Sequence, residues 1–175
     1  LGLHPDEPRK VRFIASGEQN FKHPLLMLQL GRLVSTPGSD LSEQTIALRG
    51  RAISAVALTL AALVFWRIAR RCLAEPFAYL AALTWSVTPI VVVHAHYLKE
   101  DALLTLGCWL SILAFLGFWN RPNAHRALLW GACCGLASAA HYKGFLLAVV
   151  FALVLASDPR RDMPRVGVLV GLGAL

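Results

Sequence analysis

The sequence predicts an all-α fold: a polytopic bundle of transmembrane helices with an extracytoplasmic loop that carries short amphipathic helices. Hydrophobic residues make up 57% of the 175 residues and charged residues only 15%, whereas charged residues are about a quarter of a soluble domain. Long apolar runs follow one another from residue 51 onward, and only the first 50 residues are of mixed polarity. Charged residues return between the apolar runs in short groups.

Residues 1–50 are expected to form the first extracytoplasmic loop, with helices that lie at the membrane interface. Asp6 can cap a helix that has Pro8 in its first turn and ends at Gly17. The segment 21–30 predicts a short interfacial helix entered through Pro24. Residues 35–42 contain Pro, Gly and Asp, which predicts a loop.

Residues 51–175 are expected to be the transmembrane region. Spans are predicted near 46–66, 76–93, 102–120, 127–142 and 144–157, and another is expected to start at 166. As one helix, the run 127–157 would extend about 46 Å, well beyond a hydrocarbon core of about 30 Å. Two shorter helices that meet at residues 141–144 therefore fit the membrane better. The first residue is not Met and the last lies inside an apolar run, so we expect a fragment of a longer protein.

The basic charge favours a lipid partner. The net charge is +7, from 17 Lys and Arg against 10 Asp and Glu, and such an excess is typical of proteins that meet nucleic acid or anionic lipid. If the chain crosses the membrane at each run, one side receives eight arginines in short loops, which the positive-inside tendency marks as cytoplasmic. These are Arg67, Arg70, Arg71, Arg121, Arg126, Arg160, Arg161 and Arg165. This placement favours membrane lipids and no nucleic acid.

The opposite, extracytoplasmic side receives a varied set of ionisable residues. The stretch from His94 to Asp101 places two histidines, a lysine and two carboxylates between apolar runs. Ionisable groups at membrane depth are costly, so they indicate a functional site. The residues on this side are Asp6, Glu7, Lys22, His23, His94, His96, Lys99, Glu100, Asp101, His141 and Lys143.

Four segments on this side follow one another in a characteristic order: His-Pro-Asp-Glu-Pro-Arg (4–9), Phe-Lys-His-Pro-Leu-Leu (21–26), His-Tyr-Leu-Lys-Glu-Asp (96–101) and His-Tyr-Lys-Gly (141–144). In order, spacing and sidedness they resemble the polyprenyl-phosphate-sugar-dependent membrane glycosyltransferases with the C-type fold. That group includes protein O-mannosyltransferases and lipid A aminoarabinose transferases. The resemblance implies a membrane helix before residue 1, further helices after residue 175, and a place in the bacterial plasma membrane.

The resemblance also implies a reaction and roles for residues. A sugar would move from a polyprenyl-phosphate donor to an acceptor hydroxyl of a lipid, glycan or protein, with inversion. Asp6 matches the general base in the family's first loop, and Asp101 matches the acid of its second loop. Lys143 matches the lysine of a Thr-Lys-Gly motif, although Tyr142 replaces the threonine. His23 stands before a proline as the family's basic residue does, with Lys22 beside it, so either could face the phosphate.

The chemistry of such a transfer requires the same kinds of side chain. A carboxylate can accept the proton of the attacking hydroxyl, and positive charge stabilises the departing phosphate. The candidate catalytic residues are Asp6, Asp101, Glu7 and Glu100, and the candidate phosphate or substrate ligands are Lys143, His23, Lys22, Arg9 and His96. A divalent cation is a possible cofactor, with Glu100, Asp101 and His94 as ligands.

Other interpretations stay open at this point. Asp6 could serve only as a helix cap, and Lys143 could simply extend to the membrane interface. Arg49 and Arg51 are expected to anchor the second helix and not to contact substrate. A secondary transporter could use the same His, Lys, Glu and Asp residues as a proton or ion relay. A structural membrane subunit with a polar face is a further alternative.

Overall fold

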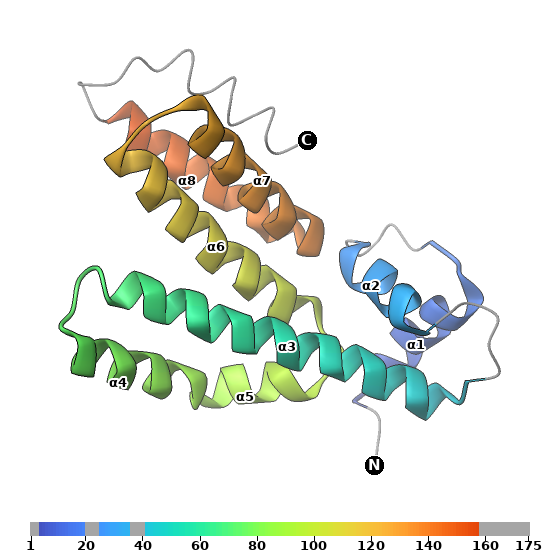
Figure 1. Cartoon of the computed structure of the whole chain (residues 1–175). Helices are drawn as coiled ribbons and strands as arrows, with labels where there is room; N and C mark the ends of the chain where they lie inside the picture. Colours follow the sequence, from blue (N-terminus) through green and yellow to red (C-terminus); the bar gives the residue numbers. More distant parts are fainter. Residues whose placement is uncertain (1–3, 20–24, 36–40, 158–175) are drawn as a thin grey trace.

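The computed structural model describes residues 4–19, 25–35 and 41–157. All regular elements in these ranges are helices, which confirms the predicted all-α fold (Figure 1). They are α1 (Glu7–Ser16), α2 (Leu26–Ser35), α3 (Glu43–Ala69), α4 (Glu75–Ser86), α5 (Pro89–His96), α6 (Glu100–Asn120), α7 (Ala124–Ala140), the 3₁₀ turn η1 (Tyr142–Gly144) and α8 (Phe145–Ala156).

Two of the described helices, α3 and α6, are long and apolar enough to cross a membrane. Helices α4 and α5 together would make a third span, but they are bent by 57° at the break between them. Pro89 begins α5, and proline cannot continue a helix without losing a backbone hydrogen bond and clashing with the preceding turn. The stretch expected as a single span near 76–93 is therefore divided into two helices by a bend.

The apolar run after residue 124 is also interrupted. Helix α7 ends at Ala140, His141 adopts an extended backbone with φ −157° and ψ 140°, and η1 leads into α8. The His141 ring caps this turn because its Nδ1 accepts a hydrogen bond from the Lys143 amide at 3.2 Å. The interruption makes two short helices, and it brings His141 to the end of the bundle where α6 begins.

Helices α3, α6 and α7 form the centre of the bundle. In Figure 1, α4 and α5 lie along one side of α3, and α6, α7 and α8 lie on the other. Helices α6 and α7 approach closely at Gly107, where an added Cβ would lie 2.7 Å from the Ala137 Cα. Small residues at such points allow membrane helices to pack through their backbones.

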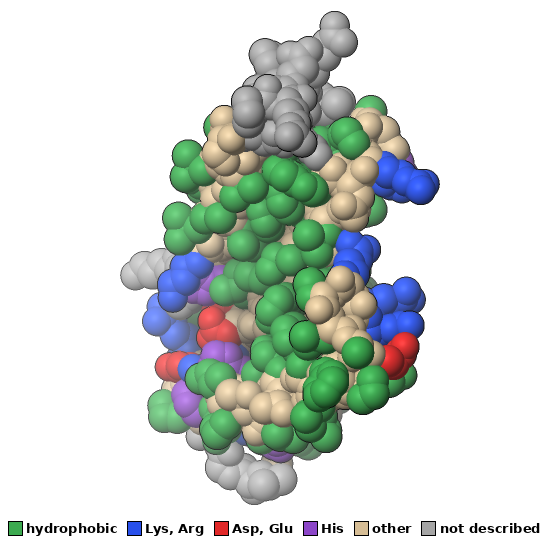
Figure 2. All heavy atoms as spheres, turned by 90° about the vertical axis from the view of Figure 1, so that its left-hand side faces the viewer, with side chains coloured by type: hydrophobic (Ala, Val, Ile, Leu, Met, Phe, Trp, Pro, Cys, Tyr) green, Lys and Arg blue, Asp and Glu red, His purple; other side chains and the backbone are tan. Residues whose placement is uncertain are grey.

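The outer surface of the bundle is apolar. Large side chains such as Phe77, Phe145 and Leu153 are more than half exposed, and Figure 2 shows a broad hydrophobic face interrupted by groups of Lys and Arg. Contiguous apolar surface of this extent is typical of a membrane-embedded protein. The chain is therefore an integral membrane protein, as predicted.

Helices α1 and α2 pack on each other at one end of α3. Val11 and Ile14 of α1 are buried with Met27 and Leu28 of α2 in one hydrophobic cluster. Helix α1 ends at Gly17, whose φ of 74° is a left-handed conformation that glycine adopts without strain. This packing sets the start of α1 against the loop between α5 and α6.

Candidate active site

A cavity of about 460 Å³ opens where α1, α2, the α5–α6 loop and the end of α7 meet. Its wall is apolar at one side and carries charged side chains of both signs elsewhere. The lining residues are Pro5, Asp6, Arg9, Lys10, Phe13, Met27, Leu28, Lys99, Glu100, Asp101 and His141. Segments that are far apart in the sequence, between Pro5 and His141, thus line the same cavity.

Glu7 fixes the start of α1. Its side chain is fully buried, and its two carboxylate oxygens accept hydrogen bonds from Arg51 at 2.9 and 2.6 Å. The amides of Leu98 and His4 donate to the same oxygens at 3.0 and 2.7 Å. Burial by itself raises the Glu7 pKa, but the hydrogen bonds from Arg51, Leu98 and His4 outweigh it and lower the pKa from 4.5 to about 2. Glu7 is therefore ionised at neutral pH, and it links α1 to α3 and to the α5–α6 loop.

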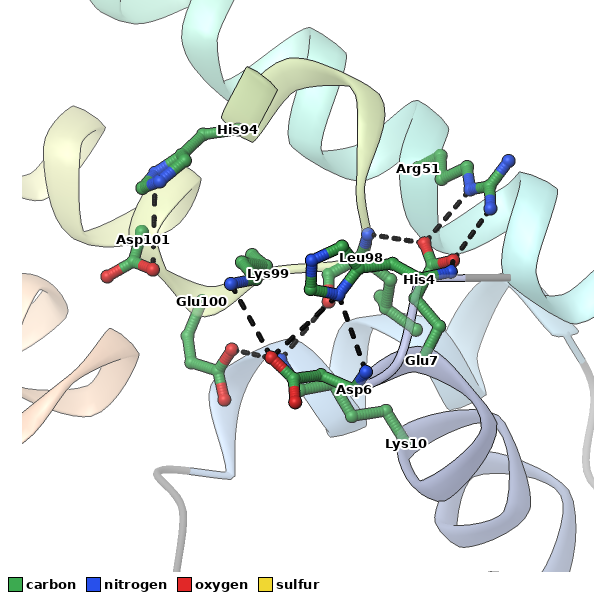
Figure 3. Close-up of polar contacts among 10 residues, drawn as sticks. All are labelled: His4, Asp6, Glu7, Lys10, Arg51, His94, Leu98, Lys99, Glu100 and Asp101. Carbon is green, nitrogen blue, oxygen red and sulfur yellow. Dashed lines mark hydrogen bonds and ion pairs between the residues drawn. The ribbon is translucent and has the colours of Figure 1, made fainter. Parts of the chain in front are cut away.

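Lys10 forms a second ionic link between α1 and the segment that leads into α6. Its ammonium group donates to the Glu100 carboxylate and, at 3.1 Å, to the Leu98 carbonyl (Figure 3). Both ionic side chains are almost buried, with 13% of Lys10 and 11% of Glu100 exposed. A buried charge without its partner is costly, so the two ion pairs together fix α1 on the loop.

Asp6 lies directly before α1 and its carboxylate stays accessible. Its side chain is 60% exposed and forms no capping hydrogen bond with the helix. The Lys99 ammonium lies 3.5 Å and the His4 Nδ1 3.8 Å from its Oδ2 (Figure 3). Asp6 therefore does not act as a side-chain cap, and its carboxylate is available to a ligand in the cavity.

Asp101 enters the cavity from another element. It lies in the first turn of α6, and its side chain is 37% exposed. The His94 Nδ1 lies 4.0 Å from its Oδ2. The helix dipole stabilises a negative charge at this position.

Of the residues predicted from the sequence, the structure brings Asp6, Arg9, Glu100 and Asp101 together at the cavity. Glu7 lies behind this wall, bound to Arg51. The Arg51 side chain, which we expected only to anchor the second helix, therefore has a specific partner.

Four further predicted ligands lie elsewhere or outside the described ranges. The His96 Nδ1 lies 2.7 Å from the Val92 carbonyl of its own helix, and His96 does not line the cavity. Lys143 is exposed in η1, and its neighbour His141 lines the cavity instead. Lys22 and His23 lie outside the described residues.

Lys10 was not among the site residues predicted from the sequence. On a helix, positions spaced by three, four and seven residues share one face. Asp6, Arg9, Lys10 and Phe13 have this spacing and all line the cavity. The helical period of the first loop could therefore have identified this face.

The candidate metal ligands do not gather. In the ranges 4–19, 25–35 and 41–157, no group of three or more His, Cys, Asp or Glu side chains could hold a metal ion. Glu100 pairs with Lys10, and Asp101 has His94 at 4.0 Å. These residues do not fit a metal site in this arrangement.

Residues 39–175 match the model of the dolichyl-phosphate-mannose-protein mannosyltransferase family. The chain belongs to this family. Comparisons with curated proteins and with solved structures return no match.

Membership in the dolichyl-phosphate-mannose-protein mannosyltransferase family confirms the relationship predicted from the four motifs. It makes the chain a membrane glycosyltransferase of the kind that uses polyprenyl-phosphate sugars. The match includes Asp101 and His141, whereas α1 with Asp6 precedes it.

Proposed function

We propose that this protein transfers a sugar from a polyprenyl-phosphate donor to an acceptor hydroxyl with inversion, and that the cavity around Asp6 and Asp101 is the active site. The acceptor is an alcohol carried by a lipid, a glycan or a protein. The observation that carries the proposal is the convergence of Asp6, Asp101, Arg9 and Lys99 on one cavity. Family membership supplies the class of donor.

Asp6 is the proposed general base. Its exposed carboxylate accepts the proton as the acceptor oxygen bonds to the anomeric carbon, and the bond from that carbon to the phosphate oxygen breaks on the opposite face. The polyprenyl phosphate leaves with the bonding electrons. A positioned base contributes about 10²- to 10⁴-fold to such a step.

Cationic side chains in the cavity receive the phosphate. Lys99 lies beside Asp6 on the α5–α6 loop, and Arg9 lies on the cavity face of α1. Guanidinium and ammonium groups bind phosphate oxygens through charge-assisted hydrogen bonds. Lys143, Lys22 and His23 are further phosphate ligands proposed from the resemblance.

The remaining carboxylates divide into two roles. Asp101 lines the cavity and is partly exposed, so we assign it to the sugar hydroxyls. Glu7 and Glu100 are engaged by Arg51 and Lys10, so they are positioning residues that set the place of Asp6. This assignment separates groups that touch substrate from groups that act through α1.

The cavity lies on the extracytoplasmic side in this proposal. It opens at the start of α6, and a helix of this length extends roughly 30 Å. Arg121 and Arg126 lie beyond the other end of α6. Arginines in short connections favour the cytoplasm, which supports placing the cavity across the bacterial plasma membrane from them.

The test is sugar transfer from a radiolabelled polyprenyl-phosphate donor pool by membranes that contain the full-length protein. Asp6→Asn and Asp101→Asn are compared at equal expression with Glu18→Gln, which changes an exposed acid that does not line the cavity. We expect Asp6→Asn to lower transfer at least about 100-fold and Asp101→Asn about tenfold, with Glu18→Gln unchanged. Transfer by Asp6→Asn at the rate of Glu18→Gln would remove Asp6 as the base. Loss of donor dependence in the parent would restore the transporter alternative.

A further inference from the structure

A second groove, of about 470 Å³, lies at the far end of α6 from the active-site cavity. Three arginines from separate parts of the chain border it: Arg71 follows α3, Arg121 follows α6 and Arg126 lies in the first turn of α7. The remaining lining residues are Leu110, Leu113, Ala114, Gly117, Asn120, Leu129 and Cys133. Among the described residues, no acidic side chain lines the groove.

The groove has an apolar wall and a basic mouth. Leu110 and Leu113 lie on α6 and Leu129 on α7. Arg121 and Arg126 lie at the connection between these two helices, and Arg71 lies after the end of α3. From Leu110 to Asn120 the α6 wall extends about 15 Å. An occupant that fills the groove therefore needs an apolar chain joined to an anionic group.

The arginines differ in how they are engaged. Arg126 donates to the carbonyls of Gly117 and Arg121 at 3.0 and 3.2 Å, and so it closes the end of α6. Across the described part of the chain, the Arg71 and Arg121 side chains form no hydrogen bond or ion pair, and both are exposed. Arg70, by contrast, pairs with Glu75 at 3.2 Å. Within the described ranges, two positive charges thus stand at the mouth of an apolar groove with no acidic side chain among its lining residues.

We propose that this groove binds one anionic phospholipid, with its phosphate on Arg71 and Arg121 and an acyl chain along the α6–α7 wall. Basic pockets between membrane helices on the cytoplasmic side bind acidic lipid headgroups. Guanidinium groups match phosphate with paired hydrogen bonds. Free phosphate would satisfy the arginines and leave the apolar wall exposed, so the groove as a whole fits a lipid. The assignment does not depend on the sugar-transfer chemistry.

The test measures the thermal unfolding temperature and lipid retention by native mass spectrometry for the full-length protein in neutral detergent. Phosphatidylglycerol, phosphatidylcholine and inorganic phosphate are added separately. The variant is Arg71→Gln with Arg121→Gln, and the control is Arg67→Gln with Arg70→Gln, which removes the same charge outside the groove. We expect phosphatidylglycerol alone to bind and to raise the unfolding temperature of parent and control, with roughly tenfold or greater loss of affinity in the variant.

A second variant tests the apolar wall. An added Cβ at Gly117 meets no atom within 4 Å, so Gly117→Leu fills the groove and leaves the arginines in place. We expect it to fold as the parent does and to bind phosphatidylglycerol more weakly. Parent-like binding by Gly117→Leu, equal binding by the two arginine pairs, or an equal effect of inorganic phosphate would each overturn the proposal.

Discussion

Arg51 donates hydrogen bonds to both carboxylate oxygens of Glu7, at 2.9 and 2.6 Å. This pair joins the first turn of α1 to α3 across 44 residues of sequence. The adjacent residue is Asp6, the proposed base. Because Glu7 is buried and Asp6 is exposed, neighbouring acids in one Asp-Glu pair have different roles. Glu7 fixes the helix, and Asp6 lines the cavity.

Removing the Glu7 charge should destabilise the protein strongly. Glu7→Gln takes away the carboxylate that neutralises Arg51 in a buried pair, and breaking such a pair costs about 3–5 kcal/mol. The free energy of unfolding of the full-length protein in detergent measures this loss. Glu75→Gln is the control because its pair with Arg70 is exposed, and it should cost less than about 1 kcal/mol. Equal losses in the two variants would contradict the structural role of Glu7.

Acid should weaken the fold through the same residue. The Glu7 pKa is lowered from 4.5 to about 2 in the folded protein, so the unfolded chain binds a proton first as the pH falls. The contribution of Glu7 to stability is complete above pH 4.5 and is lost progressively as the pH falls toward 2. Unfolding temperatures from pH 6 to pH 3 should decline more steeply for the parent than for Glu7→Gln. Parallel curves would show that another group controls the acid response.

The close contact of α6 and α7 should not tolerate a side chain at Gly107. An added Cβ would lie 2.7 Å from the Ala137 Cα and 2.9 Å from its Cβ, so Gly107→Ala must move a helix and should cost about 1–3 kcal/mol. Gly117→Ala on the same helix meets no atom within 4 Å. That control should be neutral or stabilising by up to about 1 kcal/mol. Thermal unfolding of the two variants side by side checks the prediction, and a tolerated Gly107→Ala would argue against this packing.

Two lysines should differ in their effect on transfer. Lys99 lines the cavity 3.5 Å from Asp6, whereas Lys143 is exposed and does not line it. Loss of a hydrogen bond to a charged phosphate should lower transfer roughly tenfold or more in Lys99→Gln, with a smaller loss in Lys143→Gln. Rates at saturating donor and unfolding temperatures, measured together, separate lost chemistry from lost folding. A larger loss in Lys143→Gln would move the phosphate toward the α7–α8 turn.

Much of the fold could be predicted because local chemistry determines it. Apolar runs predicted an all-α membrane protein, and Gly17 marks the end of α1 as expected. The length of the run 127–157 favoured an interruption at His141, where the described helix α7 ends. Pro89, which bends the α4–α5 pair, was visible in the sequence, although the bend was not predicted.

The ion pairs that hold the site together could not be predicted in the same way. Lys10 and Glu100 are 90 residues apart, and Glu7 and Arg51 are 44 residues apart. Any of several cations could have met either carboxylate, because pairing of distant charges depends on how helices pack and not on local sequence. The sequence therefore identified the acids but could not separate the positioning acids, Glu7 and Glu100, from those that line the cavity with exposed carboxylates.

The distance in sequence between Lys10 and Glu100 also orders events during synthesis. At roughly 5–20 residues per second, a ribosome needs about 5–20 s to add the 90 residues that separate them. Throughout that time Lys10 has been made and its ionic partner has not. His141, which completes the cavity wall, is made later still. A nascent chain stalled before residue 100 should therefore leave Lys10 open to a chemical probe, and one released after residue 157 should protect it.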